Sequence, residues 1–397
     1  MKQTIGLIGF GVVGQGVYEL VSRRSDPGIT IKKVCVRDRL KKRSLTPGKI
    51  CYDLDEVLDD DEINLVVEVI NDPDAACYIA EKALITGKSL VSANKKMVAE
   101  RLPAFRKFLA GNGTAMLYEG STCGSIPIIR NLEEYYSNDI FGSLSGILNG
   151  SANYILSRVF GDGMAYKEAL SQAQLLGFAE ADPRLDVSGE DTLSKLVILA
   201  VHSLGKWVDP STVFCSGIQN LRPADIQYAA SLGMKIRLTG NILRSGKGFS
   251  MFVIPWMMNR DNPLYHVENE YNAVVLEGEQ CSRQVLTGKG AGRMPTATAV
   301  MSDIDARTSG YGYRYRKFLN GSGVEINGEK FLNIYLRTGS EEIIRSAGFV
   351  KKGDLRKSNG YYIFTGGISL SNLTRIRKQL DESGSFIALT GFDAGDD

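Results

Sequence analysis

Residues 5–14 of the chain read Ile-Gly-Leu-Ile-Gly-Phe-Gly-Val-Val-Gly, and they indicate the architecture of the first third. It predicts a short buried strand, a glycine turn and a helix, because apolar residues recur at helical spacing after the glycines. Gly9 suits a tight turn, Gly11 lets the backbone approach a pyrophosphate, and Gly14 lets the helix pack closely on the strand. A dinucleotide site is therefore predicted at Gly9, Phe10, Gly11, Val12, Val13 and Gly14.

Length and composition indicate a multi-domain enzyme. The 397 residues, 43% of them apolar, exceed a single core and predict two or three domains. The net charge of +2, with Lys and Arg spread along the chain, argues against a nucleic-acid or membrane partner. Since no apolar run approaches the ~20 residues that span a bilayer, and no signal peptide is evident, we expect a cytoplasmic location. The six cysteines lack CxxC spacing, which predicts free thiols and no zinc site.

A basic run follows the second predicted strand, residues 31–36, and bears on cofactor choice. In a dinucleotide fold, a carboxylate at this strand end binds the 2′-hydroxyl of NAD, whereas arginine accommodates the 2′-phosphate of NADP. Arg37 comes first, Asp38 second, and further basic residues follow to position 43. The run favours NADP and leaves NAD open, and a solvated loop is the alternative interpretation.

Strands and helices alternate through the first third of the chain. Residues 64–70 and 89–93 predict buried parallel strands, with a helix over 75–86 between them. Lys95 follows the second of these strands, at the sheet edge where such folds bind ligands. Residues 1–135 therefore predict an α/β, Rossmann-type dinucleotide-binding domain.

The regular alternation of strands and helices ends after residue 136. There a helix-rich stretch is flanked by predicted strands at 143–148, 236–242, 249–254 and 273–277. This pattern predicts an α+β substrate and dimerisation domain over 136–318. The glycine-rich residues 288–292 open a helix that we expect to pack back on the first domain. Gly290 is thus a second candidate contact to a phosphate or nicotinamide.

One predicted helix in the second domain begins among several carboxylates and carries Asp191 and Lys195 four residues apart, opposite an apolar stripe. Such a pair is commonly an exposed salt bridge of little energetic value. Ile198 and His202 share their face of the helix, however, which is typical of a helix lining a cleft. Both the structural and the catalytic interpretation stay open from the residues alone.

Several motifs, in this order along the chain, carry a family resemblance: residues 9–14, 92–95, 118–121 with 126–128, 146–150 with 153–156, 177–183, 186–191 with Lys195, and 290–292 with 295–297. Together they resemble homoserine dehydrogenase over about residues 1–318. The motifs around Gly146, Glu180 and Lys195 are specific to that family rather than to dinucleotide folds at large.

The resemblance implies the reversible, NAD(P)-dependent interconversion of L-homoserine and L-aspartate 4-semialdehyde, a step toward threonine and methionine. By position it implies that Lys195 is the general acid/base, that Asp191 orients it, and that Lys95 is its partner at the substrate oxygen. Glu180 and Asp186 are implied to face the substrate ammonium, and Lys95 is also implied to contact the cofactor.

The chain departs from the usual pattern of the family at three places. Asn71 and Asp72 stand where the family has two glycines, so Asn71 is the implied nicotinamide contact at that turn. Residues 121–125 replace a glycine-richer loop, and residues 151–152 replace threonines. In the family, backbone carbonyls of this loop hold a sodium or potassium ion, which implies cation ligands at Glu119, Thr122, Gly124 and Ile126.

Residues 330–397 fall outside the resemblance, and their predicted strand, helix, strand, helix, strand order is similar to a small α+β, ACT-type regulatory module. In relatives such a module binds an amino acid such as threonine, and an extension that only aids dimerisation is the alternative. The family implies a homodimer or higher homo-oligomer formed through the sheet of the second domain. Other activities left open are another NAD(P)-dependent semialdehyde or amino-acid oxidoreductase and a non-catalytic nucleotide sensor.

Overall fold

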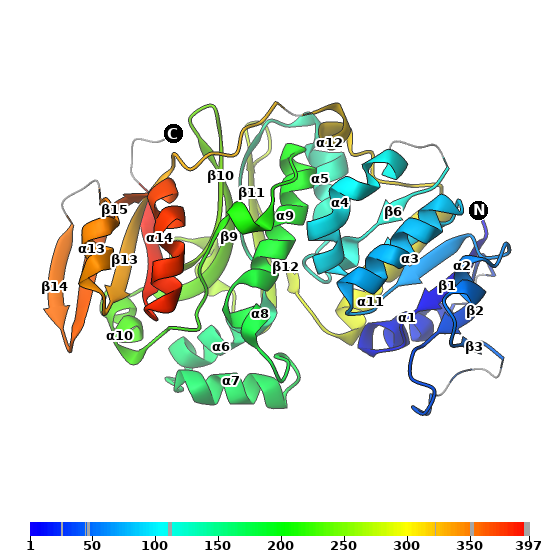
Figure 1. Ribbon diagram of the computed structural model, residues 1–397, viewed down its shortest axis with the longest axis horizontal. Coiled ribbons are helices and arrows are strands. Elements are labelled where there is room, and N and C mark those ends of the chain that lie inside the picture. Colours follow the sequence, from blue (N-terminus) through cyan, green and yellow to red (C-terminus); the bar gives the residue numbers. More distant parts are fainter. Residues whose placement is uncertain are drawn as a thin grey trace. The chain divides into compact units, whose positions relative to one another are not determined.

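The chain folds into two compact units, shown in the computed structural model of Figure 1. The structure describes residues 1–24, 27–43, 45, 48–109, 113–321, 323–349 and 353–392. The first unit comprises residues 1–137, 201–207 and 289–322, and the second comprises 138–200, 208–288 and 323–397. The division into three domains expected from the sequence stays a prediction.

A parallel six-stranded sheet organises the described part of the first unit. Its order is β3-β2-β1-β4-β5-β6, and every neighbouring pair is parallel. The direction of winding reverses between β1 and β4, and doubly wound sheets bind ligands outside the carboxyl ends of strands at such a point. The strands are β1 (Gln3–Ile8), β2 (Ile29–Cys35), β3 (Ile50–Cys51), β4 (Leu65–Glu68), β5 (Ser89–Ser92) and β6 (Met116–Leu117).

Helices of the first unit come from both ends of its sequence. The helix expected after residue 290 begins at Arg293 and packs on α1, where a Cβ on Gly16 would lie 2.7 Å from the Cβ of Ala297. The absence of a side chain at Gly16 therefore allows the two helices to approach closely. The helices are α1 (Val12–Ser22), α2 (Asp55–Leu58), α3 (Pro73–Ile85), α4 (Lys95–Leu109), α5 (Ile128–Glu134), α11 (Arg293–Thr308) and α12 (Arg316–Asn320).

A mixed ten-stranded sheet organises the described part of the second unit. Its order is β12-β11-β7-β9-β10-β16-β13-β15-β14, with β8 paired to β10. Antiparallel pairing of β11 with β7 sets Ala273 opposite Ile147, a register that matters for the site below. The strands are β7 (Phe141–Ile147), β8 (Phe214–Cys215), β9 (Lys235–Ser245), β10 (Gly248–Met258), β11 (Tyr271–Gly278), β12 (Ser282–Lys289), β13 (Phe331–Thr338), β14 (Asp354–Ser358), β15 (Tyr361–Ser369) and β16 (Phe386–Phe392).

The helices of the second unit include α9 up to Ala200, the part that carries the predicted catalytic pair. Glu190 and Asp191 occupy its first turn, where the helix dipole favours negative charge. The helices are α6 (Gly150–Gly161), α7 (Tyr166–Leu175), α8 (Arg184–Val187), α9 (Glu190–Leu204), α10 (Pro223–Ser231), α13 (Glu341–Ser346) and α14 (Leu370–Glu382). None of the helices in the described ranges is long and apolar enough to span a membrane.

The last six elements, from β13 to β16, follow a strand, helix, strand, strand, helix, strand order. Strand β14 was not predicted from the sequence, because all five of its residues are exposed and show no alternation of apolar side chains. Strand β16 pairs with β10, so this segment continues the same sheet. Its helix α14 contributes Leu373 and Ile376 to an apolar core that also contains Phe252 of β10. The assignment as an ACT-type module stays a prediction.

Candidate active site

Three glycines shape the turn between β1 and α1 in three different ways. Gly9 has a φ of +100°, and a Cβ there would lie 2.8 Å from the carbonyl oxygen of Val69. A Cβ on Gly14 would lie 2.2 Å from the carbonyl oxygen of Gly9, whereas Gly11 has nothing within 4 Å. Gly11 is also the N-cap of α1 and caps it with no side chain. The open N–H groups of this helix end are therefore suited to a pyrophosphate.

In the loop after β2 the Arg37 guanidinium is exposed, and the exposed Asp38 carboxylate is engaged by backbone N–H groups of its own loop. Oδ1 of Asp38 accepts hydrogen bonds from the backbone N–H groups of Leu40 at 2.8 Å and Lys41 at 3.2 Å. These backbone donors hold the pKa of Asp38 below its usual value. Arg37 is exposed, and within the described residues it forms no ion pair. The positively charged side chain of Arg37 is thus available to bind a phosphate of the ligand.

A buried carboxylate that the sequence analysis missed ties together the carboxyl ends of β4 and β5. Glu68 accepts from the hydroxyl of Ser92 at 2.5 Å and from the N–H of Ile70 at 2.7 Å. Its complete burial raises its pKa to about 7, although both hydrogen bonds oppose that shift. The oxygen of Ser92 also accepts from the N–H of Asn94, so Glu68 fixes the turn that leads to Lys95. A single acidic residue within an apolar strand was the available signal.

Asn71 and Lys95 lie at this same edge of the sheet. Asn71 is exposed just after β4, and Lys95 is the half-buried first residue of α4. The neighbouring Asp72 is the N-cap of α3, where its side chain accepts from two backbone N–H groups. The residue that replaces a family glycine thus has a local structural role.

The predicted cation loop is buried and packs on the segment that contains Gly290. Gly124 has a φ of +58°, and a Cβ there would lie 2.4 Å from the carbonyl oxygen of Lys289. The carboxylate of Glu119 accepts from the N–H groups of Ile129 and Arg130, so it is held away from the loop carbonyls. The carbonyl oxygen of Glu119 already accepts from the backbone N–H and the hydroxyl of Thr122. A cation at that oxygen would compete with these two hydrogen bonds.

The second unit brings Asp191 and Lys195 together in its interior. Nζ of Lys195 lies 2.7 Å from Oδ2 of Asp191 and 2.6 Å from the carbonyl oxygen of Leu148. The two residues are only 6% and 4% exposed, respectively. The interpretation as an exposed salt bridge is therefore wrong. An ion pair this deeply buried interacts in a medium of low dielectric constant, unlike an exposed pair.

Asn149, which the sequence analysis did not assign a role, connects two of the predicted carboxylates. Its Nδ2 donates to Oδ1 of Asp186 and to Oδ2 of Asp191, both at 2.7 Å. Its Oδ1 caps α6 by accepting from the N–H of Ala152 at 2.7 Å. One asparagine at a helix N-terminus thus holds Asp186 and Asp191 in a fixed arrangement around Lys195.

Two other predicted features lie outside this network. Glu180 is exposed on the loop after α7, and its backbone carbonyl, rather than its side chain, accepts from Gln174. His202 does not line a cleft as its helix face suggested, because it is 1% exposed. Its ring nitrogens lie 2.6 Å from Oε1 of Glu133 and 2.9 Å from the hydroxyl of Tyr118. Helix α9 is buried around most of its circumference, which the apolar stripe alone did not reveal.

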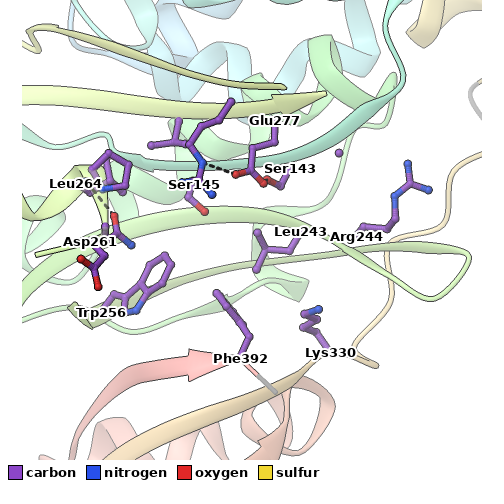
Figure 2. A pocket seen from close by; sticks show the side chains of 15 residues that line it. Ser143, Ser145, Leu243, Arg244, Trp256, Asp261, Leu264, Glu277, Lys330 and Phe392 are labelled. Carbon is purple, nitrogen blue, oxygen red and sulfur yellow. Dashed lines mark hydrogen bonds and ion pairs between the residues drawn. The ribbon is translucent and has the colours of Figure 1, made fainter. Parts of the chain in front are cut away.

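A separate cavity of about 680 Å³ lies on the face of the second unit's sheet shown in Figure 2. Trp256, Leu243 and Phe392 supply apolar lining, and Arg244 and Lys330 supply positive charge. None of the network residues around Lys195 lines it. The cavity is therefore distinct from the candidate catalytic network.

The glycine turn, the basic strand end and the buried lysine and aspartate define a nicotinamide-dependent oxidoreductase that acts on a CH–OH group. The model of the homoserine dehydrogenase NAD-binding domain matches residues 9–119, and that of homoserine dehydrogenase matches residues 127–304. The chain belongs to the homoserine dehydrogenase family. The resemblance seen in the sequence is thus confirmed, and the alternatives to it are not favoured.

Individual relatives agree with this assignment. The homoserine dehydrogenase of Bacillus subtilis is 35% identical over 352 residues, which cover 84% of this chain and 81% of that protein. The homoserine dehydrogenase of Helicobacter pylori is 36% identical over 310 residues, 76% of this chain and 73% of that protein.

Solved structures of the family share the fold. A homoserine dehydrogenase from Thiobacillus denitrificans aligns with a TM-score of 0.81 at 27% identity, covering 99% of this chain and 97% of that one. A hyperthermophilic archaeal homoserine dehydrogenase mutant, solved in complex with NADPH, aligns with a TM-score of 0.67 at 26% identity, covering 79% of this chain and 99% of that one.

Proposed function

We propose that this chain catalyses the reversible, NAD(P)-dependent interconversion of L-homoserine and L-aspartate 4-semialdehyde, in the synthesis of threonine and methionine. The observation that carries the proposal is the buried contact of Lys195 with Asp191 and the Leu148 carbonyl in a chain of this family. Two acceptors on one ammonium are the arrangement expected for a lysine that must hold a proton at a defined point.

Lys195 has the central role in the proposed chemistry. Reduction of the aldehyde requires a hydride at the carbonyl carbon and a proton at its oxygen, and Nζ of Lys195 donates that proton. In the reverse direction Nζ accepts the proton from the homoserine hydroxyl. When bound, the nicotinamide supplies or accepts the hydride. Asp191 orients Nζ. From the family resemblance, Lys95 is proposed to bind the substrate oxygen and the nicotinamide end of the cofactor.

Two carboxylates are proposed to bind the substrate ammonium. Asp186 is half-buried and is held by Asn149, so it is suited to a fixed contact. Glu180 is exposed on its loop, so its contact with the ammonium requires substrate to bind over that loop.

The proposed cofactor is NADP, bound by residues 9–14, Arg37, Asn71 and Gly290, with NAD as the weaker alternative. The exposed guanidinium of Arg37, and the Asp38 carboxylate already engaged by backbone N–H groups, support this preference. A monovalent cation at the carbonyls of Glu119, Thr122, Gly124 and Ile126 stays a prediction from the family resemblance.

We further propose that the chain is a homodimer formed through the sheet face that contains the cavity of Figure 2, which is lined by Trp256 and Phe392. Large apolar side chains on a sheet face are stabilised by a second copy of the same surface. A cytoplasmic location and a threonine-binding C-terminal module stay predictions.

The direct test of the proposed function is oxidation of NADPH, followed by its absorbance, when purified protein is mixed with aspartate 4-semialdehyde. Repeating the assay with NADH measures cofactor preference. Since an aldehyde-oxidising enzyme would instead need an accessible nucleophile, the complete burial of Cys123 favours the proposed activity. A protein that binds NADPH but does not reduce aspartate 4-semialdehyde with either nucleotide would be a nucleotide sensor.

A further inference from the structure

The carbonyl oxygen of Leu148 accepts hydrogen bonds from two side chains, and only one of them is the proposed catalytic lysine. Nζ of Lys195 lies 2.6 Å away, and Nδ2 of Asn272 lies 3.0 Å away. Asn272 belongs to β11 and directly precedes Ala273, which pairs with Ile147 of β7. The strand pairing therefore brings Asn272 beside the point where the chain leaves β7 at Leu148.

The Leu148 carbonyl helps to set the direction in which Nζ of Lys195 points its remaining N–H group. An ammonium has three N–H groups, and Asp191 and Leu148 accept two of them. The third N–H is the one that can reach a substrate oxygen, and its direction is set by where the two acceptors stand. Asn149 holds the Asp191 carboxylate, and Asn272 holds the Leu148 carbonyl.

We propose that Asn272 is a positioning residue that directs the proton of Lys195 toward the substrate oxygen by fixing the Leu148 carbonyl. The inference rests on the proposed role of Lys195. Asn272 does not itself touch the reacting atoms in this scheme, and it acts only through the shared carbonyl.

The surroundings of Asn272 indicate that its side-chain amide serves the contact with the Leu148 carbonyl rather than packing. Asn272 is completely buried, and its Oδ1 has no hydrogen-bond partner among the residues that the structure describes. A buried amide oxygen without a partner lowers stability, because its lost hydrogen bonds to water are not replaced. An apolar side chain of the same size would be the more stable choice for packing alone, so the Nδ2 contact with Leu148 is what the amide contributes.

Asn241 is a matched control in the same sheet. It lies on β9, is completely buried, and also has an Oδ1 without a partner in the described part of the chain. Its Nδ2 donates to the carbonyl and hydroxyl oxygens of Thr239, at 3.3 and 3.0 Å. Because neither oxygen belongs to the contacts of Lys195, loss of this amide tests the effect of burial alone.

The experiment compares Asn272→Leu, Asn272→Ala and Asn241→Leu. Leucine fills the space of asparagine and removes the N–H donor, so Asn272→Leu is expected to melt at or above the temperature of the wild type. We expect kcat to fall at least about tenfold in both Asn272 variants, with KM for NADPH and aspartate 4-semialdehyde within about twofold. The solvent deuterium isotope effect on kcat should rise, because proton transfer becomes more rate-limiting. Asn241→Leu should leave kcat and the isotope effect unchanged.

The outcomes separate this inference from the proposed function. If Asn272→Leu folds and keeps the kcat and isotope effect of the wild type while Lys195→Ala is inactive, the role of Asn272 is rejected and that of Lys195 stands. Equal losses of kcat in Asn272→Leu and Asn241→Leu would also reject it, since burial would explain both. If Lys195→Ala retains normal turnover, the proposed function of Lys195 itself fails.

Discussion

Asp191 lies one helical turn before Lys195 on α9, and its Oδ2 accepts from both Nζ of Lys195 and Nδ2 of Asn149 at 2.7 Å. One carboxylate oxygen thus joins the lysine to the asparagine that also holds Asp186. This arrangement makes the lysine part of a fixed network rather than an isolated charge. Removing one partner leaves the other charge buried and unpaired, so a thermal melt of each variant must accompany its turnover.

Replacement of Lys195 by alanine should lower kcat by about a hundredfold or more, because general acid/base groups contribute on that order. Affinity for NADPH, measured by fluorescence titration, should persist. The control is Lys378→Ala, which removes a lysine from an exposed pair with Glu382 four residues later, and it should leave kcat unchanged. Near-normal turnover of Lys195→Ala would return Asp191 and Lys195 to a purely structural role.

Replacement of Arg37 by alanine should weaken the binding of NADPH about tenfold and the binding of NADH by much less. Only NADPH has a 2′-phosphate for a charge-assisted contact. Dissociation constants for both nucleotides measure the effect. Arg39 lies over the ring of Tyr52, and Arg39→Ala serves as the control for a general loss of positive charge. A wild type that prefers NADH, or equal losses of both nucleotides, would overturn the NADP preference.

Glu68 should make stability depend on pH. Because burial raises its pKa from 4.5 to about 7 in the folded chain, the folded state holds a proton there that the unfolded state has lost. The free energy of unfolding should therefore fall as pH rises from about 4.5 to 7, by up to ~3 kcal/mol.

Glu68→Gln removes that ionisation, so its stability relative to the wild type should increase with pH across this window. Urea denaturation at pH 5 and pH 8 measures the difference. The exposed substitution Glu342→Gln should show no such trend. If the difference in free energy of unfolding between Glu68→Gln and the wild type is the same at pH 5 and pH 8, the raised pKa of Glu68 is contradicted.

Replacement of Trp256 by glutamate should convert the proposed dimer to a monomer, because a charge at an apolar interface is costly to bury. Because Trp256 also packs against apolar cores of its own chain, a thermal melt must show that the variant is folded. Light scattering coupled to gel filtration gives the mass. Leu175→Glu changes an exposed apolar residue of α7 and should leave the mass unaltered. A wild type that is monomeric at all concentrations would refute the proposed interface.

A chain that ends before Phe331 should fail to fold its second unit rather than merely lose regulation. The missing segment contributes Leu373, Ile376 and Leu389 to a core shared with Phe214 and Phe252. Circular dichroism melts should show loss of cooperative unfolding. Threonine binding is therefore better tested on the full chain, by calorimetry at millimolar threonine. A truncated protein that melts like the wild type and remains active would show that the segment is dispensable.

The parts of the site that could be predicted from the sequence are those that a short local pattern specifies. Gly9, Gly11 and Gly14 lie in one turn, and their roles follow from the missing Cβ at each position. Asp191 and Lys195 lie four apart on one helix, so their contact follows from helical geometry. Whether that helix face is buried could not be read from its own residues, because burial depends on the sheet that packs against it.

The other members of the site depend on strand register. Asn272 reaches Leu148 across 124 positions, and Glu68 reaches Ser92 across 24, in each case through the pairing of separate strands. No spacing in the sequence encodes such contacts, and an asparagine or a glutamate in an apolar strand was the signal available. Strand β14 was missed for a different reason, since an exposed, charged edge strand carries no apolar alternation.

Strand β16 comes after every other strand of its sheet in the sequence, yet it lies between β10 and β13. During synthesis the neighbouring edges of β10 and β13 are therefore without their partner until residues 386–392 leave the ribosome. The sheet that carries Leu148 and Asn272 can close at its centre only after β16 has been made, by contacts of high sequence separation that form slowly. Until then the nascent chain exposes strand edges and needs protection from aggregation.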